Sequence, residues 1–172
     1  MVRKSKPEDI PEIMNIILDA QASMKLLGIS QWQNGYPNEN SFAKDIAEGI
    51  SHVYEEDGEI VATAAIFTAP EPDYAKIYDG EWKTSGDYGV VHRIAVKKEV
   101  KRGGYAAKMI EYAAELTRKA GYGSIRIDTH EGNIPMRTFL KKQGFEECGI
   151  IYLSNEGCVD NKRIAYEKIL NK

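Results

Sequence analysis

Cysteine is scarce in this chain, and a strong net charge is absent. Cys148 and Cys158 are the only two cysteines, and no paired Cys/His spacing for zinc or secreted disulfide framework surrounds them. We therefore expect two free thiols and no metal site. The formal net charge of −3 argues against the broad basic surface of a nucleic-acid binder. The expected partner is a small molecule, with no nucleic acid.

Long apolar runs are also absent. Residues 1–9 read Met-Val-Arg-Lys-Ser-Lys-Pro-Glu-Asp, without an apolar stretch behind them, so we expect neither a secretory signal nor a membrane span, and a cytoplasmic protein. The 42% of hydrophobic and 28% of charged residues are typical of a packed globular protein. The length suits one domain over residues 1–172. The protein is expected to be a monomer or a homodimer.

The predicted order of elements is helix, helix, hairpin, strand, helix, strand, helix and hairpin. Apolar residues recur at helical spacing from Pro7 to Leu27, and Ser5 with Glu8 has the spacing of a capping box. The later elements are a helix at 40–48, strands at 52–55, 59–67 and 88–96, a helix at 104–120, a strand at 124–129, a helix at 133–143, and strands at 150–153 and 163–169. The segment 69–86, with its prolines, glycines and aromatics, is expected to be a long loop over a substrate.

Basic residues and glycines meet at the start of the helix at 104–120. The segment 97–106 reads Lys-Lys-Glu-Val-Lys-Arg-Gly-Gly-Tyr-Ala. The first turn of a helix has free N–H groups and the positive end of the helix dipole. Gly103 and Gly104 let a phosphate approach the backbone, and the neighbouring bases offset its charge. The segment therefore predicts a pyrophosphate site, with a solvated basic loop as the alternative.

The sequence Lys101-Arg-Gly-Gly-Tyr-Ala resembles the acetyl-CoA-binding motif of the GNAT superfamily of N-acetyltransferases, Arg/Gln-x-x-Gly-x-Gly/Ala. Lys101 keeps the charge of that motif but loses the planar fork of arginine. Asn133, followed by Met136, Phe139 and Lys142-Gln-Gly-Phe145, is similar to the second family motif. The order of elements also agrees, so the resemblance covers most of the chain.

The resemblance implies an α/β chain with the GNAT acyl-CoA N-acyltransferase fold. That fold has a central mixed, mostly antiparallel sheet with a splayed parallel strand pair, flanked by helices. It implies acetyl-CoA (coenzyme A) as the cofactor, with pantetheine amides paired to the backbone of Ile94 and Val96. The implied cofactor-binding residues are Ile94, Ala95, Val96, Lys101, Arg102, Gly103, Gly104, Tyr105, Ala106, Asn133, Met136, Phe139 and Lys142. Core packing remains the alternative for Met136 and Phe139.

The implied reaction is direct attack of an amine on the thioester, which requires a base and is helped by an acid. The family's acid tyrosine corresponds to Leu140, which cannot donate a proton, so Tyr152 or a water is expected to substitute. His92 is the expected base, because strand alternation places Val90, His92 and Ile94 on one face, which looks toward the acceptor in this family. A structural histidine is the alternative.

The amine acceptor cannot be named from the sequence. Trp32, Tyr36, Trp82 and His130 are candidates to line its site, although loop aromatics often only pack. The acceptor classes that remain open are a small-molecule amine, a polyamine and a peptide amine, and the acidic chain favours a cation.

Two other functions compete with this interpretation. A noncatalytic acetyl-CoA-binding or regulatory module is prompted by Leu140 at the acid position. A Rossmann-type dinucleotide site is prompted by Asp128, which ends a strand one helix after the glycines, but the Gly-x-Gly-x-x-Gly spacing is absent.

Overall fold

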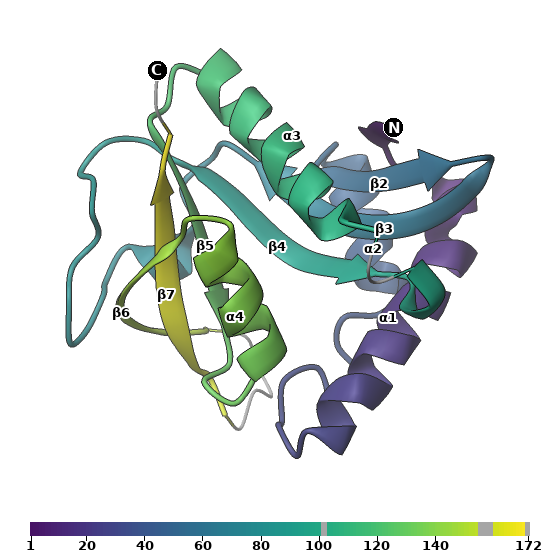
Figure 1. The fold of residues 1–172 in the computed structure, drawn as a ribbon, viewed down its shortest axis with the longest axis horizontal. Coiled ribbons are helices and arrows are strands. Elements are labelled where there is room, and N and C mark those ends of the chain that lie inside the picture. Colours follow the sequence, from purple (N-terminus) through teal and green to yellow (C-terminus); the bar gives the residue numbers. More distant parts are fainter. Residues whose placement is uncertain (101–102, 155–159, 171–172) are drawn as a thin grey trace.

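The computed structural model describes residues 1–100, 103–154 and 160–170, which form a single mixed sheet between helices (Figure 1). Its strands are β1 (Val2–Lys4), β2 (Ser51–Glu56), β3 (Glu59–Phe67), β4 (Gly89–Val96), β5 (Ser124–Thr129), β6 (Glu146–Tyr152) and β7 (Lys162–Ile169). Their order across the sheet is β1-β2-β3-β4-β5-β7-β6. Neighbouring strands are antiparallel except β4 and β5, which run parallel. The predicted mixed, mostly antiparallel sheet is confirmed.

Helices cover both faces of this sheet (Figure 1). They are α1 (Ile10–Leu26), α2 (Glu39–Ala47), α3 (Tyr105–Lys119) and α4 (Ile134–Lys142), with 3-10 turns η1 (Pro7–Asp9), η2 (Pro72–Tyr74) and η3 (Lys98–Val100). The apolar stripe of α3, with Met109 and Ile110, packs on one face together with Leu140 of α4. Ile13 and Ile17 of α1 pack on the other face with α2. Within the described residues, no helix is both long and apolar enough to cross a bilayer.

The predicted capping box at the start of the first helix is wrong. Ser5 extends the pairing of β1, because its N–H donates to the carbonyl oxygen of Ser51 (2.9 Å) and its hydroxyl contacts the Ser51 hydroxyl (2.8 Å). Asp9, not Glu8, accepts the N–H of Lys6 (2.7 Å) at the start of η1. The predicted Ser5–Glu8 capping box therefore does not form.

The other element boundaries are close to the predictions. The N-cap of α2 is Asn38, whose side chain accepts the Ser41 N–H (3.2 Å), so this helix begins slightly earlier than predicted. β1 was not predicted, and β6 begins at Glu146 rather than Ile150. The turn of the terminal hairpin, with Cys158, lies outside the described residues, whereas Cys148 is a buried free thiol.

The parallel ladder between β4 and β5 is short. The two strands pair only at Gly89 with Ile125 and at Val90 with Arg126, after which they diverge. β5 is instead paired along its whole length with β7. The predicted splayed parallel pair is confirmed, and the gap lies at the carboxyl ends of both strands.

A β-bulge interrupts β4 just after His92. Thr63 pairs with Ala95 and Ala65 pairs with His92, so two residues of β4, Arg93 and Ile94, oppose one residue of β3. Arg93 has a φ of +53°, a left-handed conformation that costs a non-glycine residue about 1–2 kcal/mol.

The bulge changes which side chains of β4 share a face. Val91 and Ile94 both pack in the cluster beneath α3, whereas Val90 packs with Tyr74 on the opposite face. The His92 ring contacts Tyr74 on that opposite face, with 5.8 Å between ring centroids. The prediction that His92 and Ile94 share a face is therefore wrong, because the extra residue shifts the alternation by one.

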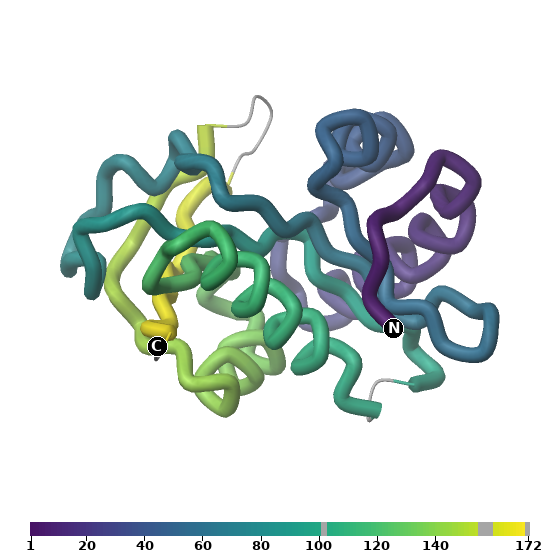
Figure 2. The backbone as a smooth tube through the Cα atoms, turned by 90° about the horizontal axis from the view of Figure 1, so that it is seen from above, coloured from purple at the N-terminus to yellow at the C-terminus, as the bar shows by residue number. Residues whose placement is uncertain are grey.

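Residues 68–88, between β3 and β4, form the predicted long loop, which lies beside β6 (Figure 2). Backbone groups of Tyr78 and Ile150 exchange two hydrogen bonds of 2.8 Å. The Arg126 guanidinium lies over the rings of Trp82 (4.2 Å) and Tyr88 (3.9 Å), and Glu167 accepts the N–H of Lys83 (2.6 Å). These contacts hold the loop over the sheet face opposite α3.

Candidate active site

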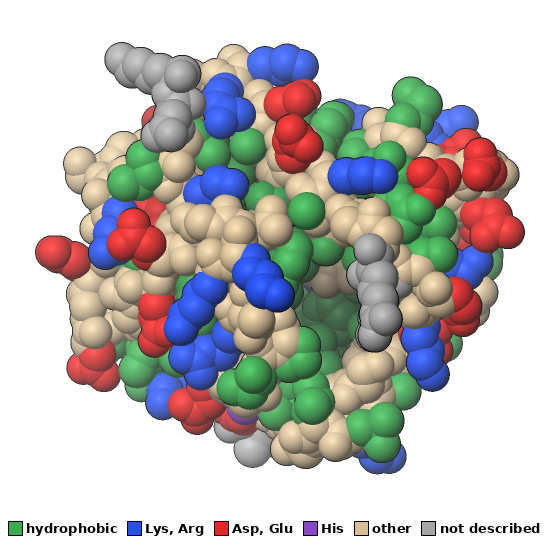
Figure 3. All heavy atoms as spheres, viewed as in Figure 1, with side chains coloured by type: hydrophobic (Ala, Val, Ile, Leu, Met, Phe, Trp, Pro, Cys, Tyr) green, Lys and Arg blue, Asp and Glu red, His purple; other side chains and the backbone are tan. Residues whose placement is uncertain are grey.

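A pocket of about 410 Å³ opens where β4 and β5 diverge. Four segments besides these strands line it, namely the chain after α1, the loop 68–88, the start of α4 and the described ends of the terminal hairpin at Leu153, Asp160 and Arg163. The face that carries α3 and α4 is hollowed between its helices and strands, and hydrophobic side chains line that hollow (Figure 3). The sheet thus has an accessible gap where its ladder ends.

The two walls of the pocket differ in chemistry. On the side of α3 and α4, the wall is apolar and contains Val91, Ile94, Ile127 and Met136. On the side of the loop 68–88, ionisable groups line it, and we call four of them the His92 cluster, which consists of Glu71, Tyr74, His92 and Asp128. The pocket therefore joins an apolar half to a polar half.

Short contacts connect the His92 cluster. Nε2 of His92 lies 2.9 Å from Oε2 of Glu71, and the Tyr74 hydroxyl donates to Oδ2 of Asp128 (2.7 Å). Nδ1 of His92 lies 3.9 Å from the same Asp128 oxygen. These contacts join η2 in the loop to β4 and β5, so the loop supplies half of the cluster.

The environment sets the protonation of Glu71 and Tyr74. Burial alone would raise the pKa of Glu71, but the hydrogen bond and charge of His92 outweigh it and hold that pKa below its ordinary value. Burial, reinforced by the Asp128 carboxylate, raises the pKa of Tyr74 well above its ordinary value. At neutral pH Glu71 is therefore a carboxylate and Tyr74 a protonated donor.

The ionised Glu71 fixes the tautomer of a neutral His92. A carboxylate only accepts hydrogen bonds, so Nε2 must carry the ring proton and donate it to Glu71. Nδ1 then carries the lone pair and faces Asp128. Two acceptors, Nδ1 and the Asp128 carboxylate, converge on the pocket, an arrangement that suits a ligand with N–H donors.

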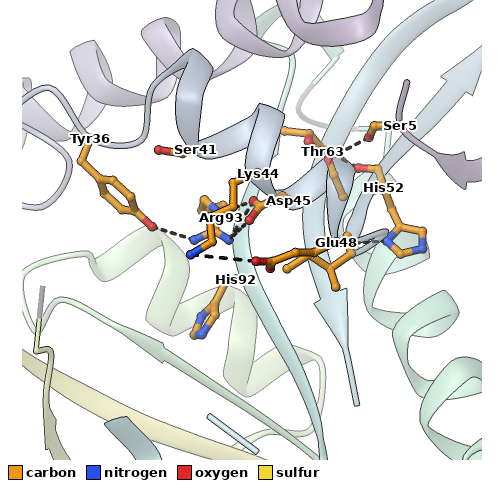
Figure 4. A network of polar contacts seen from close by, with 12 residues as sticks. Ser5, Tyr36, Ser41, Lys44, Asp45, Glu48, His52, Thr63, His92 and Arg93 are labelled. Atoms are coloured by element: carbon orange, nitrogen blue, oxygen red, sulfur yellow. Dashed lines mark hydrogen bonds and ion pairs between the residues drawn. The ribbon is translucent and has the colours of Figure 1, made fainter. Parts of the chain in front are cut away.

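Arg93 points away from His92 toward α2 (Figure 4). Its guanidinium donates to both carboxylate oxygens of Asp45 (2.8 Å each) and to the Tyr36 hydroxyl (2.6 Å). The Asp45 side chain is only 7% exposed, so its ion pair with Arg93 is buried and offsets the strain of the left-handed backbone of Arg93. The bond from Arg93 to the Tyr36 hydroxyl holds Tyr36 at the pocket. Asp45 also neutralises the charge of Arg93.

The backbone of β4 presents polar groups to the gap. The Lys97 N–H donates to the Val61 carbonyl oxygen (2.8 Å), and successive residues of an antiparallel strand direct these groups to opposite sides. The N–H and C=O groups of Ile94 and Val96 therefore point away from β3, toward the side where the ladder with β5 ended at Val90.

The predicted phosphate segment lies at the start of α3. Gly104, with a φ of +73°, is its N-cap, and Lys108 makes the first intrahelical bond, to the Gly104 carbonyl oxygen (3.1 Å). The N–H groups of Tyr105 and Ala106 thus have no partner within the helix. A Cβ added to Gly104 would meet no atom within 4 Å. Lys101 and Arg102 lie outside the described residues.

The second predicted motif is divided between pocket and core. Asn133 caps α4 by accepting the Met136 N–H (3.2 Å), and both residues line the pocket. Phe139 packs in the cluster beneath α3, Lys142 is exposed, and Ala95 packs against α1. The structure thus brings Ile94, Asn133 and Met136 together and leaves Phe139, Lys142 and Ala95 outside the pocket lining.

The predicted acid, Tyr152, is not at the pocket, and neither is Leu140, which occupies the acid position of the family. Leu140 is fully buried in the core cluster. Tyr152 is 44% exposed, and its ring lies against Tyr78, with 5.2 Å between centroids. Because β6 directs Ile151 into the core, its neighbour Tyr152 points outward.

Two of the four residues predicted to line the acceptor site are at the pocket, and two are not. Trp32 and Tyr36 line the pocket. Trp82 lies outside it, because its indole N–H donates to the Tyr74 carbonyl oxygen (3.0 Å) under Arg126. His130 also lies outside the lining and pairs with Asp160 (2.6 Å).

Glu71 and Tyr74 were not predicted from the sequence, and Asp128 was considered for the Rossmann-type alternative. Glu71 is 21 residues from His92 and lies in a Pro-Glu-Pro stretch, so no regular spacing relates them. The proline pair around Glu71 was the available signal, because it marks a rigid turn in a loop expected to be functional.

Comparisons with known proteins agree with this architecture. The chain matches the family model of the GNAT acetyltransferases over residues 15–145, and a comparison with curated proteins finds no match. A GNAT acetyltransferase structure from Streptococcus agalactiae is 32% identical, covers 100% of this chain and 96% of its own, and has a TM-score of 0.80. A candidate acetyltransferase from Staphylococcus aureus is 26% identical over 99% of each chain, with a TM-score of 0.72.

A more distant structure shows the same fold. The ribosomal-protein-alanine N-acetyltransferase from Brucella melitensis is 18% identical over 99% of each chain, with a TM-score of 0.68. The splayed strand pair, the helix that begins at its open end and these matches exclude the Rossmann-type alternative. The chain belongs to the GNAT family of acetyltransferases.

Proposed function

We propose that this chain transfers the acetyl group of acetyl-CoA to a primary amine held in the pocket between β4 and β5. The observation that carries this proposal is the end of the β4–β5 ladder after Val90. The backbone groups of Ile94 and Val96 face that gap, and buried backbone groups require partners. A ligand with amides along its length, such as pantetheine, matches them.

The start of α3 suits the phosphate end of the same ligand. Free N–H groups and the positive end of the helix dipole favour an anion there. Gly104 has no side chain, and the space where its Cβ would lie is open. These features support a pyrophosphate site beside Tyr105 and Ala106.

When bound, acetyl-CoA supplies an acyl group that is activated as a thioester. The His92 cluster binds the amine and accepts its proton. Nδ1 of His92 accepts the amine proton, and Glu71 stabilises the imidazolium that forms. Asp128, held by Tyr74, accepts a second N–H of the amine and orients its lone pair.

The charge of the pocket supports a cationic acceptor. Four carboxylates line it, those of Glu71, Asp73, Asp128 and Asp160. Two arginines also line the pocket. Arg93 is neutralised by Asp45, and Arg163 lies beside Asp160, whose backbone carbonyl oxygen accepts its N–H (2.9 Å), so carboxylates dominate the wall near His92. A small-molecule amine, a polyamine or a peptide amine with a nearby positive charge fits this environment.

Release of free thiol tests the proposal. Protein, acetyl-CoA and a panel of amines are mixed, and we expect thiol release that depends on the amine. His92→Ala should lower the rate by about 10²–10⁴-fold, while calorimetry shows unchanged affinity for acetyl-CoA. His92→Gln, which cannot accept a proton, should resemble the alanine variant. Binding without release for any amine would favour the noncatalytic module, and absence of binding would refute both functions.

A further inference from the structure

One buried hydroxyl in the described residues has no hydrogen-bond partner. It belongs to Thr129, the last residue of β5, which is 1% exposed. Thr129 lines the pocket. Buried polar side chains are nearly always bonded, because an unpaired one destabilises the fold. The exception therefore points to a ligand as the partner of this hydroxyl.

Thr129 belongs to the apolar half of the pocket. Alternation along β5 places Thr129 on the same face as Ile125 and Ile127, which pack beneath α3. Asp128 faces the other way, into the His92 cluster. The hydroxyl therefore lies on the wall that carries Ile94 and Met136, away from the proposed base.

The other polar side chain at this end of the pocket is already bonded. The side-chain oxygen of Asn133 accepts the Met136 N–H (3.2 Å), and its amide group donates to Gln31 (3.4 Å). Among the described side chains of this wall, the Thr129 hydroxyl is thus the buried polar group without a partner.

We propose that the Thr129 hydroxyl donates a hydrogen bond to the sulfur of the acyl-donor thioester and thereby assists the leaving group. This inference rests on the proposed function. In the donor, sulfur joins pantetheine to the acetyl carbon. If pantetheine lies beside Ile94 and Val96 and the acetyl carbon points toward His92, the sulfur would lie between the two halves, where β5 ends at Thr129.

The step is balanced in atoms and charge. The amine nitrogen bonds to the carbonyl carbon, its proton passes to Nδ1 of His92, and the carbon–sulfur bond breaks with both electrons on sulfur. Thr129 keeps its own proton and stabilises the thiolate, which later takes a proton from water. Leu140 cannot provide this help, because its side chain is apolar and fully buried.

Thr129→Val and Thr129→Ser test the inference. Valine has nearly the same shape but no hydroxyl, so it should lower kcat about 10- to 100-fold, as expected for a lost hydrogen bond to a charged group. Serine keeps the hydroxyl and should retain most of the activity. Without bound cofactor, Thr129→Val should melt at the parental temperature or higher, because the Thr129 hydroxyl of the parent has no partner within the described part of the protein.

Titration of bound coenzyme A gives a readout that does not depend on turnover. The thiolate absorbs in the ultraviolet, and the pKa of the bound thiol should be about 1–2 units higher in Thr129→Val than in the parent. An unchanged thiol titration would refute the contact with sulfur, and a clearly lower melting temperature would show that the hydroxyl is bonded within the protein. If the parent protein does not bind acetyl-CoA, the proposed function itself fails, and this inference fails with it.

Discussion

Replacement of Glu71 by glutamine should separate the charge of the His92 cluster from its shape. The Glu71 carboxylate has two hydrogen-bond contacts, because Oε2 lies 2.9 Å from Nε2 of His92 and Oε1 accepts the Asp73 N–H (3.2 Å). The Asp73 N–H requires an oxygen, so the amide NH₂ of the introduced glutamine turns toward His92. This group only donates, so the ring proton must move to Nδ1, and the lone pair that faces Asp128 is lost.

The magnitude follows from the lost carboxylate. A hydrogen bond to a charged group contributes about 1.5–3 kcal/mol, which corresponds to about a 10- to 150-fold lower kcat when the imidazolium loses it. The wrong tautomer adds to this loss. The affinity for acetyl-CoA should not change, because Glu71 lies in the other half of the pocket.

The pH dependence has a definite sign. The pKa of Glu71 lies below its ordinary value, so the carboxylate is charged throughout the acid limb of kcat/KM and favours the imidazolium. Its removal should move the midpoint of that limb to lower pH.

The measurement is the pH profile of thiol release, with Glu81→Gln as the control. Glu81 lies in the same loop, but its side chain is exposed and outside the pocket lining. If Glu71→Gln keeps the parental kcat and the same acid limb as Glu81→Gln, the coupling between Glu71 and His92 is refuted.

Two further predictions concern the cofactor and the loop. Gly104→Asp should abolish acetyl-CoA binding in calorimetry, because it adds a negative charge where phosphate approaches, while Gly121→Asp at the other end of α3 should not; equal binding by both would exclude this phosphate site. Both glycines have positive φ and open space around a built Cβ, so the strain is matched. Glu167→Gln should lower the free energy of unfolding in urea by about 3–5 kcal/mol, because it leaves Arg126 buried without its 3.2 Å partner. Hydrogen bonds hold the pKa of Glu167 below its ordinary value despite burial. In the parent, the stability that the Glu167 carboxylate contributes should therefore be lost as pH falls below about 4.3. The free energy of unfolding of Glu167→Gln should depend less on pH in this range.

The elements with a local signal could be predicted from sequence. Asp57 and Gly58 form the expected turn between β2 and β3, and both have positive φ, which is the property that marks such turns in a sequence. β5 occupies the predicted residues 124–129, because the breakers Gly121 and Gly123 mark its start. In contrast, β1 is only three residues long and is stabilised by pairing with β2, so no periodic pattern reveals it.

The polar half of the site could not be predicted in the same way. Asp45 and Arg93 are 48 residues apart, and nothing local indicates that an arginine adopts a left-handed conformation, which usually favours glycine or asparagine. Alternation along β4 therefore gave the wrong partner for His92. Glu71 and Tyr74 reach the cluster only through the packing of the loop, which depends on contacts with Arg126 and Glu167.

The bulge in β4 adds a residue to the strand without moving its ladder. Deletion of Arg93 would leave a regular ladder, in which His92 still pairs with Ala65 and Ala95 with Thr63. The later side chains would keep their faces, and Val96 would still present its backbone groups to the gap. What the deletion removes is the guanidinium that pairs with the buried Asp45 and holds Tyr36. A homologue that lacks this residue should therefore keep the sheet and also lack the buried carboxylate at the position of Asp45.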